Sequence, residues 1–173
     1  MDEKALTLWF TGLPGSGKTT LASLIAKRLR ESGKRTEILD GDGFRKLVGS
    51  FGFSREDRKR NVLSVAFTAF MLNRNGIFTT AAFVSPYRSH RQEVRELIGT
   101  PFVEIFVDCP LSVCQDRDPK GLYKKAAAGT LTGLTGVDDP YEPPINPEVV
   151  VKTAEQTVQE SLEHISLFLK DRV

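Results

Sequence analysis

Residues 6–19 read LTLWFTGLPGSGKT, and this stretch decides the fold. Leu6 to Thr11 is a continuous apolar run, which is typical of a strand buried on both faces. The run ends in Gly12-Leu13-Pro14-Gly15-Ser16-Gly17-Lys18-Thr19, which matches the pattern G-x-x-x-x-G-K-[ST] in full. Thr20 to Arg30 then carries apolar residues at a helical period. A buried strand, a glycine-rich turn and an amphipathic helix are the context in which such a loop binds phosphate.

The residue types of this loop suit the phosphates of a nucleoside triphosphate. Its glycines let backbone N–H groups converge on phosphate oxygens, and the following helix adds its positive dipole end. Lys18 is expected to reach the β and γ phosphates, and Thr19 to place a hydroxyl on Mg²⁺. A glycine-rich turn without ligand is the weaker reading, because motif and context agree. The loop residues predicted to bind ATP are Gly12, Leu13, Pro14, Gly15, Ser16, Gly17, Lys18, Thr19 and Thr20.

Downstream of this unit, strand-like and helical stretches alternate. Strands are expected at 36–39, 77–84 and 102–107, and helices at 54–76 and 92–98. Such alternation predicts parallel βαβ units, and hence a three-layer α/β fold of the P-loop kinase kind around a central, mostly parallel sheet. The chain has 173 residues and no interdomain linker, which predicts a single domain over 1–173.

The periodicity disappears from Asp118 to Pro147, a stretch rich in Gly, Lys, Asp and Pro. It is too long for a plain connection, and long loops in compact domains are usually lids or binding loops. We therefore expect a mobile lid over about 118–136. A last helix should follow a capping box of Thr153 and Gln156. Its expected buried residues are Val158, Leu162, Ile165 and Leu169.

Composition excludes several other classes of protein. With 24 basic and 22 acidic residues, the chain lacks the basic bias of a general nucleic-acid binder. The N-terminus starts acidic and its apolar run is short, and no stretch is long enough to span a membrane. Cys109 and Cys114 are the only cysteines, which favours a reducing cytoplasm. His90 and His164 are far apart in sequence, so no zinc site is expected.

Asp40-Gly41-Asp42 ends the second expected strand, and ligands of open α/β sheets bind at that edge. One of these two carboxylates could touch the Mg²⁺ shell, while the other could accept a proton from an attacking hydroxyl. A solvated Asp-Gly turn is the alternative for this pair alone. The chain lacks the Asn-Lys-x-Asp motif of a GTPase and is too short for a motor ATPase, so a small-molecule kinase fits best.

Further segments resemble the adenylylsulfate kinase family, in order from Leu8 to about Val150. They are Asp40-Gly41-Asp42 with Arg45; Gly52-Phe53-Ser54; Asp57-Arg58 with Asn61; Ser85-Pro86-Tyr87-Arg88; 118–126, which reads DPKGLYKKA; 135–142, which reads TGVDDPYE; and Asn146-Pro147. The DPKGLYKKA string is far more specific than the phosphate loop. The resemblance implies transfer of the γ-phosphoryl of ATP to the ribose 3′-hydroxyl of adenylylsulfate, giving 3′-phosphoadenylylsulfate and ADP.

The resemblance also implies a role for each matching residue. Asp42 would position the 3′-hydroxyl, and Arg45, Arg58 and Asn61 would hold the sulfate–phosphate anhydride, for which guanidinium groups are well suited. Phe53 would stack on the acceptor adenine. The remaining assignments are backbone contacts from Val84 and Ser85, and lid contacts to phosphate from Arg117, Lys120 and Lys124. The alternatives without a ligand-binding role are a solvated helix charge for Arg58 and a core position for Phe53.

Ser85 and Leu134 need separate comment. The family places a phosphoserine intermediate at Ser85, so Ser85 counts among the catalytic candidates with Lys18 and Asp42. Two arguments oppose that role. Direct in-line transfer needs no covalent relay, and the sequence shows no adjacent base that would activate Ser85. Leu134 stands where the family usually has phenylalanine, on the other face of the acceptor base. The loop from Arg45 to Phe53 is about one residue shorter than usual. Both departures lie on the acceptor side, so they bear on the identity of the acceptor more than on the binding of ATP.

Two other functions stay open at this point. One is a small P-loop kinase for a nucleoside monophosphate, gluconate or shikimate; the other is a silent nucleotide-binding module, against which intact Lys18, Thr19, Asp40 and Asp42 argue. The resemblance suggests a homodimer. Coupling to an ATP sulfurylase, and the choice between sulfate assimilation and sulfation, are left open by the sequence.

Overall fold

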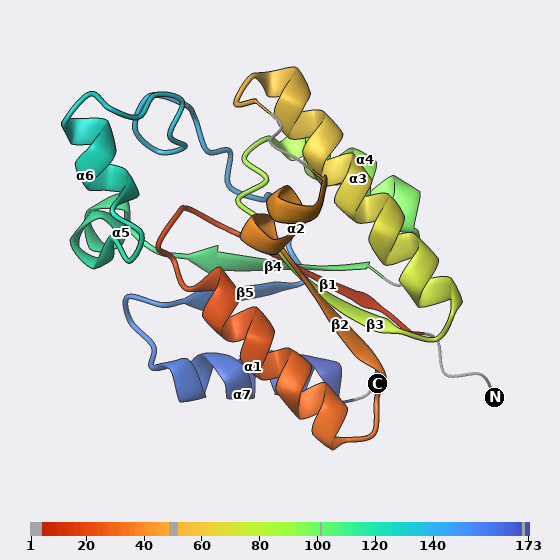
Figure 1. The fold of residues 1–173 in the computed structure, drawn as a ribbon. Helices are drawn as coiled ribbons and strands as arrows, with labels where there is room; N and C mark the ends of the chain where they lie inside the picture. The colour runs from red at the N-terminus through yellow and green to blue at the C-terminus, as the bar shows by residue number, and fades with distance from the viewer. Residues whose placement is uncertain (1–4, 49–51, 101, 171) are drawn as a thin grey trace.

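The computed structural model describes residues 5–48, 52–100, 102–170 and 172–173, and only the backbone of 45–48 (Figure 1). The strands are β1 (Thr7–Thr11), β2 (Thr36–Asp40), β3 (Phe78–Ala82), β4 (Phe102–Asp108) and β5 (Val149–Lys152). The helices are α1 (Lys18–Glu31), α2 (Gly41–Val48), α3 (Arg55–Arg74), α4 (Arg88–Ile98), α5 (Leu111–Arg117), α6 (Leu122–Ala127) and α7 (Val158–Leu169). None of the helices in these ranges is both long and apolar enough to cross a membrane.

The described strands form one parallel sheet in the order β2-β3-β1-β4-β5. Helices α1 and α7 cover one face and α3 and α4 cover the other, as Figure 1 shows. Apolar residues form a core on each face; Leu8 and Phe10 of β1 lie in one, and Trp9 lies in the other. The predicted three-layer α/β fold is therefore confirmed.

The central position of β1 places the phosphate loop in the middle of the sheet edge. Phe10 is in register with Ala82 of β3, and Thr11 with Phe106 of β4. Because parallel strands end at the same edge, the loop after β1 meets the segments that follow β2, β3 and β4. All the residues that were expected to bind ligand after a strand therefore converge on this edge.

The helix starts give one confirmation and one correction. The helix expected over 54–76 is present as α3, and Ser54 caps it, because its side chain accepts the N–H of Asp57. The expected capping box of Thr153 and Gln156 is wrong, since the box consists of Thr157 and Glu160, four residues later. This shift turns Val158 outward, so that it is 50% exposed, whereas Leu162, Ile165 and Leu169 are buried as predicted.

Four elements were not expected from the sequence. Helix α2 begins within Asp40-Gly41-Asp42, α5 directly precedes the expected lid, α6 lies inside it, and β5 follows Pro147. The expectation of an irregular stretch over 118–147 is therefore wrong at α6. Six residues make fewer than two turns, which is too short for a helical period to be visible.

Candidate active site

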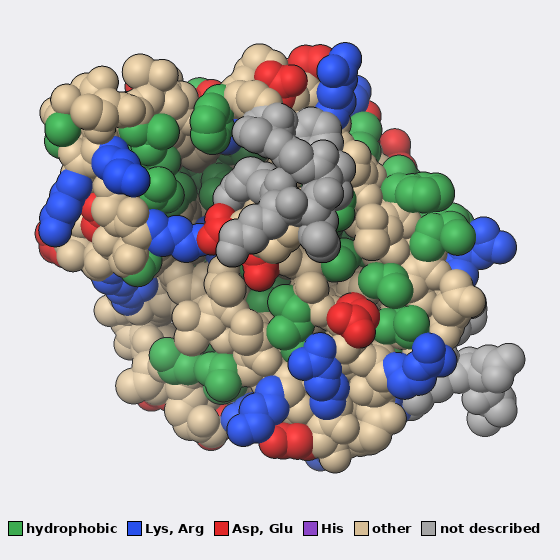
Figure 2. Space-filling model, in the orientation of Figure 1, with side chains coloured by type: hydrophobic (Ala, Val, Ile, Leu, Met, Phe, Trp, Pro, Cys, Tyr) green, Lys and Arg blue, Asp and Glu red, His purple; other side chains and the backbone are tan. Residues whose placement is uncertain are grey.

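One cavity of about 890 Å³ opens at the carboxyl edge of the sheet. Its wall includes residues 14–21 of the phosphate loop and α1, residues 40–42, residues 82–86, part of α3, and, at the start of the lid and within it, residues 117–120, 122–123 and 131–135. On the face in Figure 2, Lys and Arg side chains are scattered among Asp and Glu instead of forming one patch. Attraction of an anionic ligand thus depends on the local arrangement in the cavity.

The phosphate loop has the backbone that its glycines allow. Gly15 has a φ of +78°, in the left-handed region, and a Cβ there would lie 3.0 Å from the carbonyl oxygen of Cys114. At Gly12, a Cβ would lie 2.5 Å from the carbonyl oxygen of Val107. These positions require glycine, since a side chain would collide with β4 or α5. The loop therefore presents its N–H groups at the first turn of α1, where an anion is favoured.

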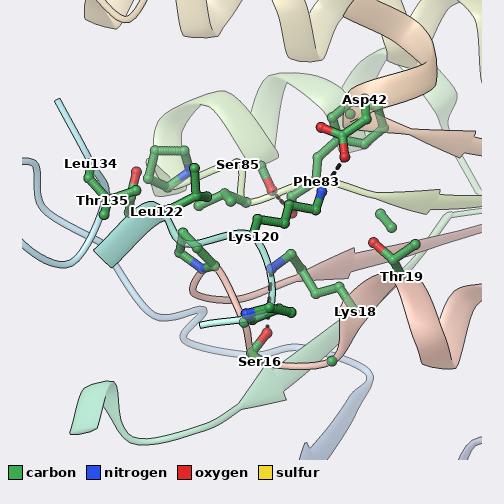
Figure 3. A pocket seen from close by; sticks show the side chains of 18 of the residues that line it. Ser16, Lys18, Thr19, Asp42, Phe83, Ser85, Lys120, Leu122, Leu134 and Thr135 are labelled. Atoms are coloured by element: carbon green, nitrogen blue, oxygen red, sulfur yellow. Dashed lines mark hydrogen bonds and ion pairs between the residues drawn. The ribbon is translucent and has the colours of Figure 1, made fainter. Parts of the chain in front are cut away.

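Lys18 points along the loop, as Figure 3 shows, and its Nζ donates to the carbonyl oxygen of Leu13 at 2.6 Å. Only 8% of Lys18 is exposed, and burial lowers the pKa of its ammonium group to about 7. A buried cation with neutral partners is stabilised by an approaching phosphate. Thr19, next in sequence, is exposed and lines the cavity.

The two carboxylates after β2 have different environments. Oδ1 of Asp40 accepts the N–H groups of Asp42 at 2.9 Å and of Gly43 at 2.6 Å, so Asp40 fixes the start of α2. Asp42 is half-exposed and forms an ion pair with Lys120 of the lid, drawn as a dashed line in Figure 3. Asp40 and Asp42 thus form a structured helix start that lines the cavity, which differs from the solvated turn considered above.

Arg58 of α3 joins two distant segments at the far side of the cavity. Its Nη1 donates to Thr135 Oγ1 at 2.9 Å, and its Nη2 donates to the carbonyl oxygen of Gly133 at 2.5 Å. Nη2 also lies 3.4 Å from Oδ2 of Asp139. These contacts exclude the alternative of a solvated helix charge. Arg58 instead holds a cation at the cavity wall.

Asn61, one turn further along α3, is buried at Oδ1 and has no hydrogen-bond partner for that atom within the described chain. A buried, unpaired oxygen is costly and rare, so it marks a place where a ligand or water completes the site. Phe53 also lines the cavity and is 61% exposed, which excludes the core position considered for it. Arg58 lies 5.9 Å from the centre of the Phe53 ring.

Ser85 is held in a strained backbone conformation at the end of β3. Its φ is +39°, and it is 3% exposed. Its Oγ accepts the indole N–H of Trp9 at 3.0 Å and lies 3.1 Å from Thr11 Oγ1. The carbonyl oxygen of Val84 accepts a hydrogen bond from Thr11 at 2.7 Å. Both residues line the cavity, with the Ser85 hydroxyl engaged by the strands below.

A part of the cavity near the phosphate loop was missed from the sequence. Arg117, which was predicted, donates to the carbonyl oxygen of Thr153 at 2.6 Å, and Thr153 donates to that of Ser16 at 2.8 Å. The unpredicted wall residues here are Thr153, Gln156, Val158 and Ser161. Ser161 Oγ is buried without a partner within the described chain. No motif marks these residues, and the first two were assigned to a helix cap.

Leu134 is 7% exposed and packs with Cys109, Cys114 and Tyr123 beneath the lid, while also lining the cavity. Gly12, Leu13 and Lys124 are absent from the cavity wall. The side chain of Arg45 and the shortened loop at 49–51 lie outside the described residues. The other predicted site residues are brought together in one cavity.

The fold and this cavity define a small kinase of the P-loop class. A phosphate loop with a buried lysine, a carboxylate beside it and an arginine across the cavity provide for a phosphoryl donor and an anionic acceptor. The class is set by these residues, because the fold alone serves many reactions.

The comparisons name the family. The family model for adenylylsulphate kinase matches residues 4–152, and the chain belongs to this family. It is 51% identical to the adenylyl-sulfate kinase of Synechococcus sp. (strain JA-2-3B'a(2-13)) over 99% of this chain and 98% of the relative. It is 46% identical to that of Halothermothrix orenii over 99% of this chain and 92% of the relative. The solved structure of the Mycobacterium tuberculosis APS kinase CysC in complex with AMPPNP and APS has a TM-score of 0.91 at 38% identity, covering 96% of this chain and 98% of that one.

Proposed function

We propose that this chain transfers the γ-phosphoryl group of ATP to the ribose 3′-hydroxyl of adenylylsulfate, releasing ADP and 3′-phosphoadenylylsulfate. The observation that carries the proposal is that one cavity is lined by Lys18 and the rest of its phosphate loop, by Asp42, and by the Arg58–Asn61 pair. A nucleotide donor and an anionic acceptor would face each other there. Membership of the adenylylsulfate kinase family supports this acceptor over gluconate, shikimate or a nucleoside monophosphate.

On the donor side, which comprises residues 14–20, Arg117, Thr153, Gln156, Val158 and Ser161, the loop N–H groups bind the phosphates. Lys18 neutralises charge that develops on the transferring group. The hydroxyl of Thr19 and the free oxygen of Asp40 are hard oxygen donors, which suit Mg²⁺ held together with nucleotide phosphates. When bound, Mg²⁺ would supply charge neutralisation at the β and γ phosphates. The wall residues beyond Thr153, which are Gln156, Val158 and Ser161, would receive the base of ATP.

On the acceptor side, which comprises Asp42, Phe53, Arg58, Asn61, Val84 and Ser85, Arg58 and Asn61 would bind the sulfate–phosphate anhydride. Asp42 orients the 3′-hydroxyl and accepts its proton as the bond to phosphorus forms. The Lys120 ammonium must leave Asp42 for that step, and the incoming phosphates offer it another anionic partner. The Ser85 hydroxyl is already engaged by Trp9 and Thr11, which favours direct transfer over a phosphoserine relay.

The lid and the assembly complete the proposal. Residues 118–136 would close over the phosphates and exclude water, with Lys120 moving between Asp42 and ligand.

Phe67 and Met71 are exposed one turn apart on α3, which supports a homodimer that uses this helix. Two free, buried cysteines suit the reducing cytoplasm in which sulfate assimilation would place the enzyme.

The test is ADP release from ATP and Mg²⁺ with adenylylsulfate, compared with gluconate, shikimate and AMP as acceptors. We expect turnover with adenylylsulfate but with none of the other three acceptors. NMR should show the new phosphate of the product on the ribose 3′ position. Turnover with another acceptor would overturn the proposed substrate. Nucleotide binding without ADP release in the presence of any of these acceptors would support the silent module instead.

A further inference from the structure

Arg91 of α4 is the least exposed Lys or Arg residue in the described part of the chain, yet it lies outside the cavity. It is 3% exposed. Its Nε donates to Glu104 Oε1 at 2.8 Å, its Nη1 to the carbonyl oxygen of Ser85 at 2.6 Å, and its Nη2 to that of Glu142 at 2.6 Å. One planar guanidinium therefore ties β4, the segment after β3, and the segment after the lid into one unit.

The Ser85 contact meets the backbone where it is strained. Ser85 and Asp118 are the non-glycine residues with positive φ among those that the structure describes, and both line the cavity. A strained conformation persists only when its surroundings over-determine it. At Ser85, Trp9 and Thr11 hold the hydroxyl from β1, and Arg91 holds the carbonyl oxygen from α4.

The Glu142 contact extends the same control to Arg58. Glu142 donates its N–H to the carbonyl oxygen of Pro86 at 2.8 Å, so this segment runs alongside the one after β3. Asp139, three residues earlier, accepts from the Tyr87 hydroxyl at 2.7 Å and pairs with Arg58. Both segments that Arg91 joins therefore carry groups of the acceptor side. Within the described residues, no hydrogen bond or ion pair of Arg91 reaches residues 12–19.

We infer that Arg91 is a positioning residue for the acceptor, acting through the Ser85 carbonyl and the Glu142 segment. A buried ion pair such as Arg91–Glu104 is weak support for a purely stabilising role, because its desolvation offsets much of its attraction. Three hydrogen bonds to three segments instead fix geometry. The inference rests on the proposed function, since it concerns the adenylylsulfate half of that reaction.

The test separates acceptor recognition from nucleotide binding. Arg91→Met should raise the KM for adenylylsulfate by roughly tenfold or more, because small displacements of positioning groups are costly. Binding of ATP alone, measured by calorimetry, should stay unchanged. Arg91→Lys keeps the charge, but its ammonium group cannot donate hydrogen bonds to all three of Glu104, Ser85 and Glu142. It should therefore give a smaller increase in the KM for adenylylsulfate.

Two further variants guard against a loss of folding. Arg91→Met combined with Glu104→Gln removes the buried carboxylate that would otherwise lose its nearest cation, and it should show the same selective increase. Arg95→Met is the matched control, because Arg95 contacts Glu104 and Glu148 of the same network but not Ser85 or Glu142. Its acceptor KM should be unchanged.

Equal changes in the acceptor KM and in ATP affinity would overturn the inference, as would an Arg95→Met variant that reproduces the effect. Failure of the proposed function has a different signature. In that case the unsubstituted protein itself would release no ADP with adenylylsulfate, whereas failure of this inference leaves that activity intact.

Discussion

The donor side of the cavity is built mainly from one short stretch, residues 14–20, whereas the acceptor side draws on residues around Asp42, Arg58, Ser85 and Thr135. The donor stretch forms its own turn, with the N–H of Ser16 bonded to the carbonyl oxygen of Leu13. The acceptor side depends on contacts between residues far apart in sequence, such as Arg58 with Thr135, which are 77 positions apart.

This difference determines how each side responds to substitution. Phosphate binding by the loop uses backbone groups, so only residues such as Lys18 contribute through their side chains. The proposed acceptor site would instead use side chains, such as that of Arg58, which contacts the Thr135 side chain. A change on the acceptor side therefore removes a ligand contact and also displaces neighbours, whereas a change at the loop acts on the ligand directly.

The largest expected effect tests the residue between the two sides. Asp42→Asn should lower kcat by about 10²- to 10⁴-fold, the usual contribution of a general base or hydroxyl-orienting group. ATP affinity, measured by calorimetry, should stay unchanged. Lys120→Met is the companion variant, because it removes the partner of Asp42 and keeps the carboxylate. A collapse of ATP affinity with normal residual kcat would make Asp42 a nucleotide or metal ligand.

The next effect belongs to the donor side. Lys18→Ala should lower kcat by about 10²-fold or more, because it removes charge stabilisation at the transferring phosphoryl group. Lys27→Ala is the matched control, since Lys27 lies on the same helix as Lys18 but is exposed and absent from the cavity wall. The measurement is ADP release at saturating acceptor, with circular dichroism to confirm folding. Full activity of a folded Lys18→Ala protein would exclude the P-loop kinase mechanism.

An effect on the acceptor side should be smaller and selective. Arg58→Met removes a cation that would bind the anhydride, and hydrogen bonds to charged groups contribute about 1.5–3 kcal/mol. The KM for adenylylsulfate should therefore rise by roughly 10- to 100-fold, with the KM for ATP unchanged. Arg60→Met is the control, because Arg60 is exposed on the same helix and pairs only with Glu56 among the described residues. An equal increase in both KM values would show that the two sides are not independent.

The same contrast explains what could be predicted from the sequence. The phosphate loop, its strand and its helix are visible because one contiguous motif contains the strand, the turn and the helix start. Arg58 and Asn61 were placed only through family resemblance, since nothing local distinguishes them from neighbouring helix charges. Arg91 and Glu104 carried no signal at all, because their pairing depends on how α4 packs against β4.

The missed elements have physical reasons as well. Strand β5 is a four-residue edge strand after a proline-rich stretch, and its burial alternates, so it lacks the continuous apolar run of β1. Thr153 was read as a cap because Ser and Thr residues near a helix usually are. Its hydroxyl instead donates to the phosphate loop, a contact across 137 positions that no local pattern encodes.

The smallest effect concerns Leu134, the main departure from the family. If it lies on one face of the acceptor base, Leu134→Phe should complete an aromatic pair with Phe53. Base–aromatic stacking contributes about 1–3 kcal/mol by truncation to alanine, and leucine already recovers part of it. We therefore expect a gain of no more than about 1 kcal/mol, roughly fivefold tighter acceptor binding. The KM for ATP should hardly change.

Burial makes this prediction sharper, because Leu134 is 7% exposed and contacts the cluster beneath the lid. A phenylalanine that turns into the cavity should bind the acceptor more tightly at an unchanged Tm. One that stays in the cluster should lower the free energy of unfolding by about 1–3 kcal/mol through overpacking, with no gain in acceptor binding. Val158→Phe adds an aromatic ring to the donor side of the same cavity and serves as the matched control. Steady-state kinetics with each substrate varied in turn, together with thermal unfolding, separates these outcomes; a change confined to the KM for ATP in Leu134→Phe would move Leu134 to the donor side.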